Sequence, residues 1–331
     1  MIFNNGYVQL YHADARQLPI PDESIDCVVT SPPYWGLRDY GEDDQLGLEE
    51  TPEEYVENMV NVFREVRRAL KDDGTLWLNL GDTYVANKGN SKAGFNERYF
   101  GKKFKTDKQS DTYKNTNITI KNPNAPKNLV GIPWRVAFAL QQDGWYLRQD
   151  IIWHKPNPMP ESVTDRCTKS HEYIFLLTKS ANYYYDADAI REPHTWVENK
   201  PRPSGMSRNG KKYREKVKYG GGGTGFSGHS GSYKADGSPL NHPLGRNKRS
   251  VWKINTQPYK EAHFAVFPEK LPELCIKAGS KKGDIVLDPF FGSGTTGFVA
   301  QRLYRKWLGI ELNPEYIKIA NKRFVQQELF V

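Results

Sequence analysis

The sequence predicts an α/β fold with a doubly wound, mostly parallel sheet, and three observations support this. Short apolar runs typical of buried strands alternate with segments of helical periodicity. The alternation occurs near both ends of the chain, and a glycine-rich turn separates one C-terminal strand from the helix after it. The 331 residues suffice for one large α/β domain, or for one domain that carries an inserted module.

The N-terminal part contains one helix with clear start signals. Thr51 can cap this helix, Pro52 suits its first turn, and Glu54 completes a capping box. Apolar residues then recur at helical spacing as far as Leu70, and Gly74 lies just beyond the expected end. A second helix is expected over residues 132–144, and strands are expected over 7–13, 25–30, 74–80, 145–155 and 171–179.

Regular structure resumes toward the C-terminus with the same alternation. The last expected helix begins at Asn313, a good capping residue, and has Pro314 in its first turn. Before it, helices are expected over 268–279 and 294–303, and strands over 284–290 and 307–312.

Two segments interrupt the alternation and carry most of the positive charge. Residues 84–128 have 10 Lys/Arg and 3 Asp/Glu, and residues 191–260 have 15 and 4. Because the whole chain has a net charge of +8, the remaining residues carry a net charge of −10. Since aromatic residues are interleaved with these basic ones, a nucleic acid is the expected partner.

Three parts of the chain are therefore expected. Residues 1–185 and 256–331 would form the two halves of one domain, with residues 84–128 as a basic insertion. Residues 186–255, rich in Gly, Pro, Ser and Lys, would form a separate basic region.

Composition excludes several other classes of protein. No apolar run is long enough to cross a bilayer, and the N-terminus lacks the pattern of a secretory signal. The three cysteines have neither disulfide-framework nor zinc spacing, so reduced thiols in a cytoplasmic protein are expected. The stretch "HEYIF" is not a zinc motif, because Phe175 stands where a second histidine would be needed, and no metal is expected.

The glycine-rich turn indicates a cofactor site. Gly292, Gly294 and Gly297 have G-x-G-x-x-G spacing between an expected strand and helix, which allows a ligand to approach backbone N–H groups. Glu311, at the end of the next strand, can accept hydrogen bonds from ribose hydroxyls. The motif predicts an adenosine-containing cofactor, either a nicotinamide dinucleotide or S-adenosylmethionine. Asp288 favours the latter, because a carboxylate repels a pyrophosphate but attracts a sulfonium or an ammonium group.

A second motif, Ser-Pro-Pro-Tyr at residues 31–34, ends another expected strand. An exocyclic amino group of a nucleobase is a poor nucleophile until both of its N–H groups are accepted in hydrogen bonds. The Ser31 hydroxyl and the Pro32 carbonyl can be those acceptors, because proline fixes the backbone direction. Tyr34 would stack on a base swung out of the duplex. Trp35 and the "GLRDYG" tail after it stay unassigned, with a flap over that base as one option.

Together these residues resemble the amino-group DNA methyltransferases of the N4-cytosine/N6-adenine superfamily. The resemblance covers nearly the whole chain outside the basic insertions and includes "TSPPY", "VLDPFFGSGTT", "GIEL" and "HFAVFPEKLPELCI". It implies a Rossmann-like S-adenosylmethionine-dependent fold with seven strands, a circularly permuted motif order of the β type, and a target recognition region within residues 186–255. The catalytic residues implied are Ser31, Pro32, Pro33 and Tyr34. The cofactor-binding residues implied are Asp14, Phe267, Lys270, Asp288, Pro289, Phe290, Gly292, Gly294, Thr295, Thr296 and Glu311.

The resemblance also suggests the substrate. Members with Ser before Pro-Pro-Tyr are mostly N4-cytosine enzymes, so Ser31 favours cytosine, with N6-adenine as the alternative. The expected partners are double-stranded DNA, a cognate restriction endonuclease and a second copy of the chain. A nicotinamide oxidoreductase is a more remote alternative, since it leaves Ser-Pro-Pro-Tyr unexplained. C5-cytosine methylation is rejected, because none of the three cysteines follows a proline.

Overall fold

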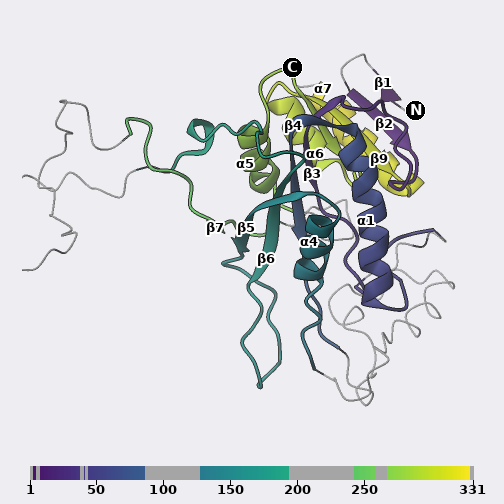
Figure 1. The fold of residues 1–331 in the computed structure, drawn as a ribbon, viewed down its shortest axis with the longest axis vertical. Helices are drawn as coiled ribbons and strands as arrows, with labels where there is room; N and C mark the ends of the chain where they lie inside the picture. The colour runs from purple at the N-terminus through teal and green to yellow at the C-terminus, as the bar shows by residue number, and fades with distance from the viewer. Residues whose placement is uncertain are drawn as a thin grey trace, which may run out of the picture. The chain divides into compact units, whose positions relative to one another are not determined.

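The protein was analysed as a computed structural model, which describes residues 3–4, 8–37, 41, 44–85, 127–193, 242–257 and 267–328. Figure 1 shows the arrangement of the helices and strands, with colour running along the chain, and their order is as follows. They are β1 (Phe3–Asn4), β2 (Val8–His12), β3 (Ile25–Thr30), α1 (Pro52–Ala69), β4 (Leu70–Leu80), α4 (Ile132–Gln142), β5 (Tyr146–His154), β6 (His171–Thr178), the 3₁₀ helix η1 (Asp188–Ile190), β7 (Val251–Lys253), α5 (Lys270–Gly279), β8 (Ile285–Asp288), α6 (Thr295–Arg302), β9 (Lys306–Glu311) and α7 (Pro314–Glu328).

The strands of the described residues form one sheet in the order β1-β2-β9-β8-β3-β4-β6-β5-β7. The inner strands β2, β9, β8, β3 and β4 are parallel, whereas β6 runs antiparallel to both β4 and β5. The predicted doubly wound, Rossmann-like fold is confirmed. The implied number of seven strands is wrong, because the short strands β1 and β7 extend the two edges of the sheet.

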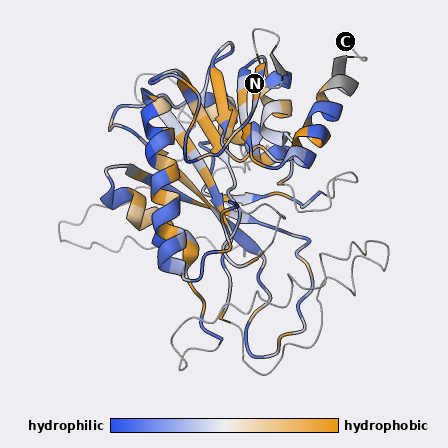
Figure 2. Cartoon of the chain, turned by 90° about the vertical axis from the view of Figure 1, so that its right-hand side faces the viewer, coloured by the Kyte–Doolittle hydropathy of each residue, from blue (hydrophilic) through white to orange (hydrophobic). Residues whose placement is uncertain are grey.

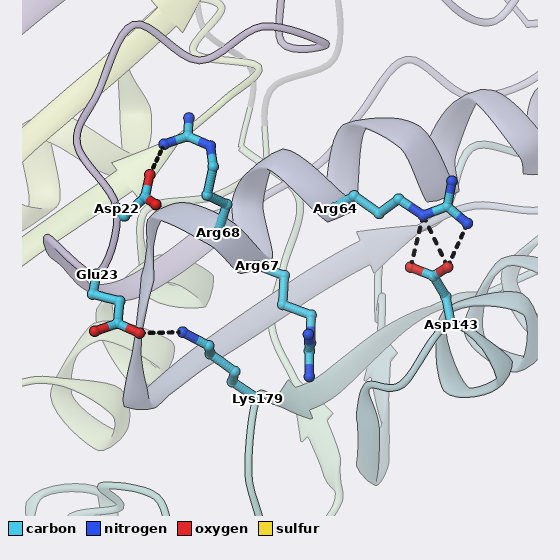
Figure 3. Close-up of a pocket in the computed structure, with 7 residues that line it drawn as sticks. All are labelled: Asp22, Glu23, Arg64, Arg67, Arg68, Asp143 and Lys179. Atoms are coloured by element: carbon cyan, nitrogen blue, oxygen red, sulfur yellow. Dashed lines mark hydrogen bonds and ion pairs between the residues drawn. The ribbon is translucent and has the colours of Figure 1, made fainter.

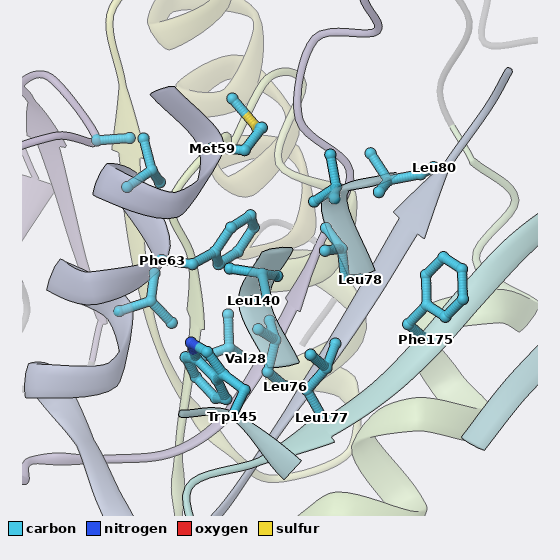
Figure 4. Close-up of a cluster of buried hydrophobic side chains, with 14 of the residues drawn as sticks. Val28, Met59, Phe63, Leu76, Leu78, Leu80, Leu140, Trp145, Phe175 and Leu177 are labelled. Carbon is cyan, nitrogen blue, oxygen red and sulfur yellow. The ribbon is translucent and has the colours of Figure 1, made fainter. Parts of the chain in front are cut away.

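One face of the sheet packs against α1 and α4. Leu76, Leu78 and Leu80 alternate along β4 and point to this face, where they meet Phe63 of α1 and Leu140 of α4 (Figure 4). In Figure 2 the strands at the centre of the sheet are coloured hydrophobic, while α1 has long hydrophilic stretches along its outer side. Successive residues at the end of β4 are all buried, because helices cover both faces of the sheet.

The opposite face packs against α5, α6 and α7. Gly279 at the end of α5 lies against Thr75 and Trp77 of β4, so closely that a Cβ atom there would sit 2.4 Å from Thr75 Oγ1. Farther along the sheet, Trp307 of β9 stacks on Phe324 of α7, with ring centroids 4.5 Å apart.

Helix α1 begins as its sequence predicts but ends earlier. Thr51 Oγ1 accepts a hydrogen bond from the Glu54 N–H, and the Glu54 carboxylate accepts one from the Thr51 N–H, both at 3.2 Å. The predicted capping box is thus confirmed. The expected end near Gly74 is wrong, because Leu70 is already extended and begins β4. Gly74 lies inside that strand, where its missing side chain leaves room for Leu70.

The chain divides into two compact units, one formed by Met1–Asp186 with Arg249–Val331 and one formed by Ala187–Lys248. The sequence places residues 186–255 in the recognition region, whereas Val251–Lys253 form β7 and pair with β5 of the large sheet. The alternation of Trp252, which is buried, with exposed Val251 is a strand pattern three residues long, too short to be recognised in the sequence.

Within the second unit, the described residues 187–193 and 242–248 are connected by a short backbone pairing. Glu192 and Arg246 form an isolated antiparallel bridge, with two backbone hydrogen bonds of 2.9 Å. The Glu192 carboxylate also pairs with Arg246 and Lys248. The long segment between them, residues 194–241, lies outside the described residues, as does most of the basic insertion 84–128.

Candidate active site

Two adjacent parallel strands bring the predicted motifs together. β3 ends in Thr30, directly before Ser31, and its neighbour β8 ends in Asp288, directly before the glycine loop. Thr30 Oγ1 donates a 2.7 Å hydrogen bond to Asp288 Oδ1, across 258 positions of sequence. Because the carboxyl ends of parallel strands meet at one edge of a sheet, these two distant motifs share one site.

The glycine loop has the backbone that its sequence predicts. Gly292 and Gly294 have φ angles of 52° and 80°, in the left-handed region that favours glycine. A Cβ atom on Gly294 would come within 3.0 Å of the Phe324 ring, whereas no atom lies closer than 3.9 Å to one on Gly292. Helix α6 then begins at Thr295, so its first N–H groups face the loop.

Asp288 is a buried residue at the start of this loop, and its side chain connects several elements. Its carboxylate accepts hydrogen bonds from the hydroxyls of Thr30 and Thr296 and from the Phe290 N–H. Burial raises the pKa of Asp288 to about 7, although these hydrogen bonds act in the opposite direction. The residue therefore holds the ends of β3, β8 and α6 in place, whatever its role toward a ligand.

The other predicted cofactor residues lie around this loop or on α5. Pro289 is buried and Phe290 is half-buried in the main core. Thr295 is buried and accepts a 3.0 Å hydrogen bond from Arg323. On the α5 side, Phe267 is half-buried just before the helix, while Lys270 is exposed and pairs with Glu273.

Glu311 and Asp14 lie together at the ends of β9 and β2, which pair in parallel. The Glu311 carboxylate accepts hydrogen bonds of 2.7 Å from the Gly292 N–H and 2.8 Å from the Asn313 N–H, so it is directly coupled to the glycine loop. Asp14 forms a bidentate pair with Arg16. Burial raises the pKa of Asp14, but the hydrogen bonds and the charge of Arg16 outweigh this and hold the pKa below its usual value.

The two prolines after Ser31 differ in whether their carbonyl oxygens accept a hydrogen bond. The Pro33 carbonyl accepts a 2.9 Å hydrogen bond from the Tyr55 hydroxyl, which fixes the turn. No residue in the described part of the chain donates to the Pro32 carbonyl. Trp35, which the sequence left unassigned, is only 1% exposed and donates to the Glu49 carbonyl, so it is part of the core and does not form a flap in this structure.

Tyr34 is held by a cluster of polar side chains. Its hydroxyl lies 3.2 Å from Ser31 Oγ, 3.1 Å from Asn79 Oδ1 and 2.9 Å from Glu172 Oε2. One side of its ring rests on Gly81, where a Cβ atom would come within 2.5 Å of the ring. Burial and the charge of Glu172 raise the pKa of the Tyr34 hydroxyl well above its usual value, so the hydroxyl keeps its proton.

Three members of this cluster were not predicted: Asn79, Glu172 and Lys155, which forms an ion pair with Glu172. Asn79 carried a signal, since it is a polar residue inside the apolar run "LWLNL" and is 2% exposed in the structure. Glu172 and Lys155 lie in the strands expected over 171–179 and 145–155, but nothing in their local sequence indicates that they meet Tyr34.

The structure also contains a cavity of about 620 Å³ away from these motifs (Figure 3). Asp22 and Glu23 directly precede β3, so this cavity lies near the amino-terminal end of that strand, whereas Ser31 follows its carboxyl-terminal end. Its three carboxylates are paired with cations of the same cavity. It is lined by Asp22, Glu23, Arg64, Arg67, Arg68, Asp143 and Lys179.

A Rossmann-like sheet with a glycine loop and a proline-fixed acceptor at adjacent strand ends fits the class of amino-group methyltransferases. A family model described as "DNA methylase" matches residues 25–322. The type II methyltransferase M.SmaI of Serratia marcescens is 45% identical over 320 residues, which cover 95% of this chain and 89% of that protein. The chain therefore belongs to this DNA methylase family, as the motifs predicted. The oxidoreductase alternative finds no support.

Solved structures show the same fold at low sequence identity. The PvuII DNA methyltransferase (cytosine-N4-specific) superposes with a TM-score of 0.59 at 21% identity, covering 96% of this chain and 88% of the other. The Thermus thermophilus protein TTHA0409, solved as a complex with S-adenosyl-L-methionine, gives a TM-score of 0.56 at 24% identity, covering 96% and 93%.

In the described part of the chain, no helix is long and apolar enough to cross a membrane. Nor does that part contain a group of three or more His, Cys, Asp or Glu side chains arranged to hold a metal ion.

Proposed function

We propose that this protein transfers a methyl group from S-adenosylmethionine to the N4 amino group of cytosine at one short site in duplex DNA. The observation that carries the proposal is the hydrogen bond between Thr30 and Asp288, which joins the Ser-Pro-Pro-Tyr motif to the glycine loop. Methyl transfer requires donor and acceptor to be held side by side, and positioning of this kind accounts for a large part of the rate of such reactions.

The glycine loop fits S-adenosylmethionine. Ser293 is 4% exposed, and its hydroxyl has no hydrogen-bond partner among the described residues, so a buried polar group is left for a ligand. A Cβ atom on Gly292 would have only one neighbour, the Phe290 carbonyl oxygen at 3.9 Å, and Glu311 accepts from the Gly292 N–H. When bound, the cofactor supplies an electrophilic methyl group. We propose that the loop N–H groups and Glu311 bind its adenosine part, with Asp14 nearby and Phe267 and Lys270 toward the methionine end.

The acceptor side is formed by Ser31 and Pro32. A hydroxyl oxygen and a proline carbonyl without a described donor can each accept one N–H of an amino group. Accepting both draws the nitrogen toward tetrahedral geometry and frees its lone pair for attack. The Tyr34 hydroxyl lies beside Ser31 Oγ, and the Tyr34 ring is proposed to stack on the base.

Cytosine is favoured over adenine by Ser31, through the family association noted for Ser before Pro-Pro-Tyr. The cytosine-N4 specificity of the PvuII enzyme agrees with it, although that likeness by itself shows only the fold. The M.SmaI relative, a type II methyltransferase, supports a role in restriction and modification. We also propose that the protein acts in the cytoplasm beside a restriction endonuclease of the same specificity, and that it can dimerise.

Mass spectrometry of nucleosides tests the proposal directly. Duplex DNA treated with the protein and S-adenosylmethionine should contain N4-methylcytosine, and DNA treated without the cofactor should not. N6-methyladenine in its place would support the alternative base, and the absence of both would overturn the proposal. Mapping the modified positions by sequencing then identifies the recognised site.

A further inference from the structure

A chain of hydrogen bonds runs from Ser31 into the interior. Ser31 Oγ donates to the Tyr34 hydroxyl at 3.2 Å, and the Tyr34 hydroxyl lies 2.9 Å from Glu172 Oε2. The other carboxylate oxygen, Glu172 Oε1, is paired with the ammonium group of Lys155. Both charged side chains are largely buried, with 15% of the Glu172 side-chain surface and 18% of the Lys155 side-chain surface exposed.

The direction of these hydrogen bonds depends on Glu172. A carboxylate only accepts hydrogen bonds, and bonds to a charged acceptor are the stronger ones. Asn79 Oδ1 is the competing acceptor, but it is neutral and lies farther from the Tyr34 hydroxyl, at 3.1 Å. The single Tyr34 proton is therefore directed to Glu172, which leaves the phenolic oxygen to accept from Ser31.

Lys155 and Asn79 keep the carboxylate in this position. The Lys155 ammonium group lies over the Trp153 ring, 4.2 Å from its centroid, while it pairs with Glu172 Oε1. Asn79 Nδ2 donates to Glu172 Oε2 at 3.3 Å and to the Tyr173 carbonyl at 3.0 Å. Each end of the carboxylate thus has its own donor.

We propose that Glu172 is a positioning residue for the acceptor group of the reaction. By accepting the hydrogen bond from the Tyr34 hydroxyl, it leaves the phenolic oxygen as the acceptor of the Ser31 hydroxyl proton. The lone pairs of Ser31 Oγ then face outward, toward the amino group of the target base. The inference rests on the proposed function and assigns to Tyr34 a second role besides stacking. Without Glu172, the Ser31 proton can turn outward and meet the N–H groups of the base as a second donor.

A double-mutant cycle of Glu172→Gln and Tyr34→Phe tests the relay, meaning the chain of hydrogen bonds from Ser31 through Tyr34 to Glu172. In the Glu172→Gln variant, the side-chain oxygen is expected to face Lys155 and the amide nitrogen to face Tyr34. The amide would then donate a hydrogen bond to the Tyr34 hydroxyl, whereas the carboxylate accepts one from it. Single-turnover rates of methyl transfer should fall roughly tenfold or more in each single variant. The double variant should be no slower than Tyr34→Phe alone, because the hydroxyl through which Glu172 acts is already absent. The dissociation constant of S-adenosylmethionine, measured by calorimetry, should stay within about twofold of the wild-type value.

Glu65→Gln is the matched control. Glu65 is also a partly buried carboxylate paired with a cation, Arg68, but it lies near the C-terminal end of α1, whereas Tyr55 near the start of this helix contacts the catalytic turn. Its replacement should leave the transfer rate unchanged. Lys155→Met, which keeps the approximate length of the side chain and removes its charge, should slow transfer less than Glu172→Gln does. That effect should also disappear when Tyr34 is replaced by Phe.

Equal slowing by Glu172→Gln in the Tyr and Phe backgrounds would overturn the relay, since the residue would then act independently of the hydroxyl. An unchanged rate in Glu172→Gln would overturn it as well. Both results differ from failure of the proposed function, in which the wild-type protein itself transfers no methyl group to DNA. That outcome would overturn the relay too, because there would be no amino group whose hydrogen bond Ser31 Oγ accepts.

Discussion

At the scale of single residues, the site depends on buried polar groups whose partners come from distant parts of the chain. Asp288 is 3% exposed and is bonded to hydroxyls from β3 and from α6. A buried carboxylate costs free energy unless it is hydrogen-bonded, and even then its charged form is disfavoured in a desolvated place. The residue is therefore well suited to hold two motifs together, but it makes stability depend on pH.

Asp288→Asn should change how stability varies with pH. Burial raises the pKa of Asp288 in the folded protein to about 7, above the value of 3.8 for an ordinary aspartate. Its ionisation therefore destabilises the folded state as the pH rises from about 4 to about 7, by at most about 4 kcal/mol. Below and above this pH range, the contribution of Asp288 to the free energy of unfolding does not change with pH.

Urea unfolding of both proteins between about pH 4 and about pH 8 measures this effect. The wild-type protein should lose stability relative to the asparagine variant across the range and then keep a constant difference above about pH 7. A difference that is the same at every pH would show that Asp288 does not titrate in this range.

At the scale of elements, the active site is positioned by where strands stop and helices start. The glycine loop passes from β8 to α6 through left-handed glycines, and Ser-Pro-Pro-Tyr follows β3 without a helix. Helix α1 returns the chain to the sheet, and its residue Tyr55 donates to the Pro33 carbonyl. The first turn of α1 therefore supports the catalytic turn as well as its own helix.

Thr51→Ala should destabilise the protein by about 1 kcal/mol, since it removes the acceptor of the Glu54 N–H at the start of α1. Chemical denaturation measures the free energy of unfolding. Glu57→Ala, an exposed substitution within the same helix, serves as the control and should change it by less than about 0.5 kcal/mol. Equal effects of the two substitutions would contradict the role of the cap.

At the scale of the whole molecule, charge is separated along the chain. The two basic segments together hold 25 of the 47 Lys and Arg residues, while the rest of the chain is acidic. Long-range attraction then favours contact of DNA with these segments, whereas the acidic remainder repels it.

The affinity for duplex DNA should consequently fall steeply with salt. If about six phosphates are neutralised, the slope of log affinity against log salt concentration is about −5. Fluorescence anisotropy of labelled DNA between about 50 and about 200 mM salt measures it. Binding of S-adenosylmethionine under the same conditions is the control and should vary little. A flat response for DNA would remove the role proposed for the basic segments.

The sequence by itself determined the fold class, the start of α1, the glycine loop and the Ser-Pro-Pro-Tyr turn. These features are local: periodicity, caps and left-handed glycines leave a pattern within a few residues. The tertiary structure alone placed Glu172 and Lys155 beside Tyr34, put Trp35 in the core, and added β7 to the sheet. The contact of Tyr34 with Glu172 joins residues 138 positions apart and depends on the pairing of β6 with β4 and β5. Side-chain periodicity carries no information about which strand becomes the neighbour of another.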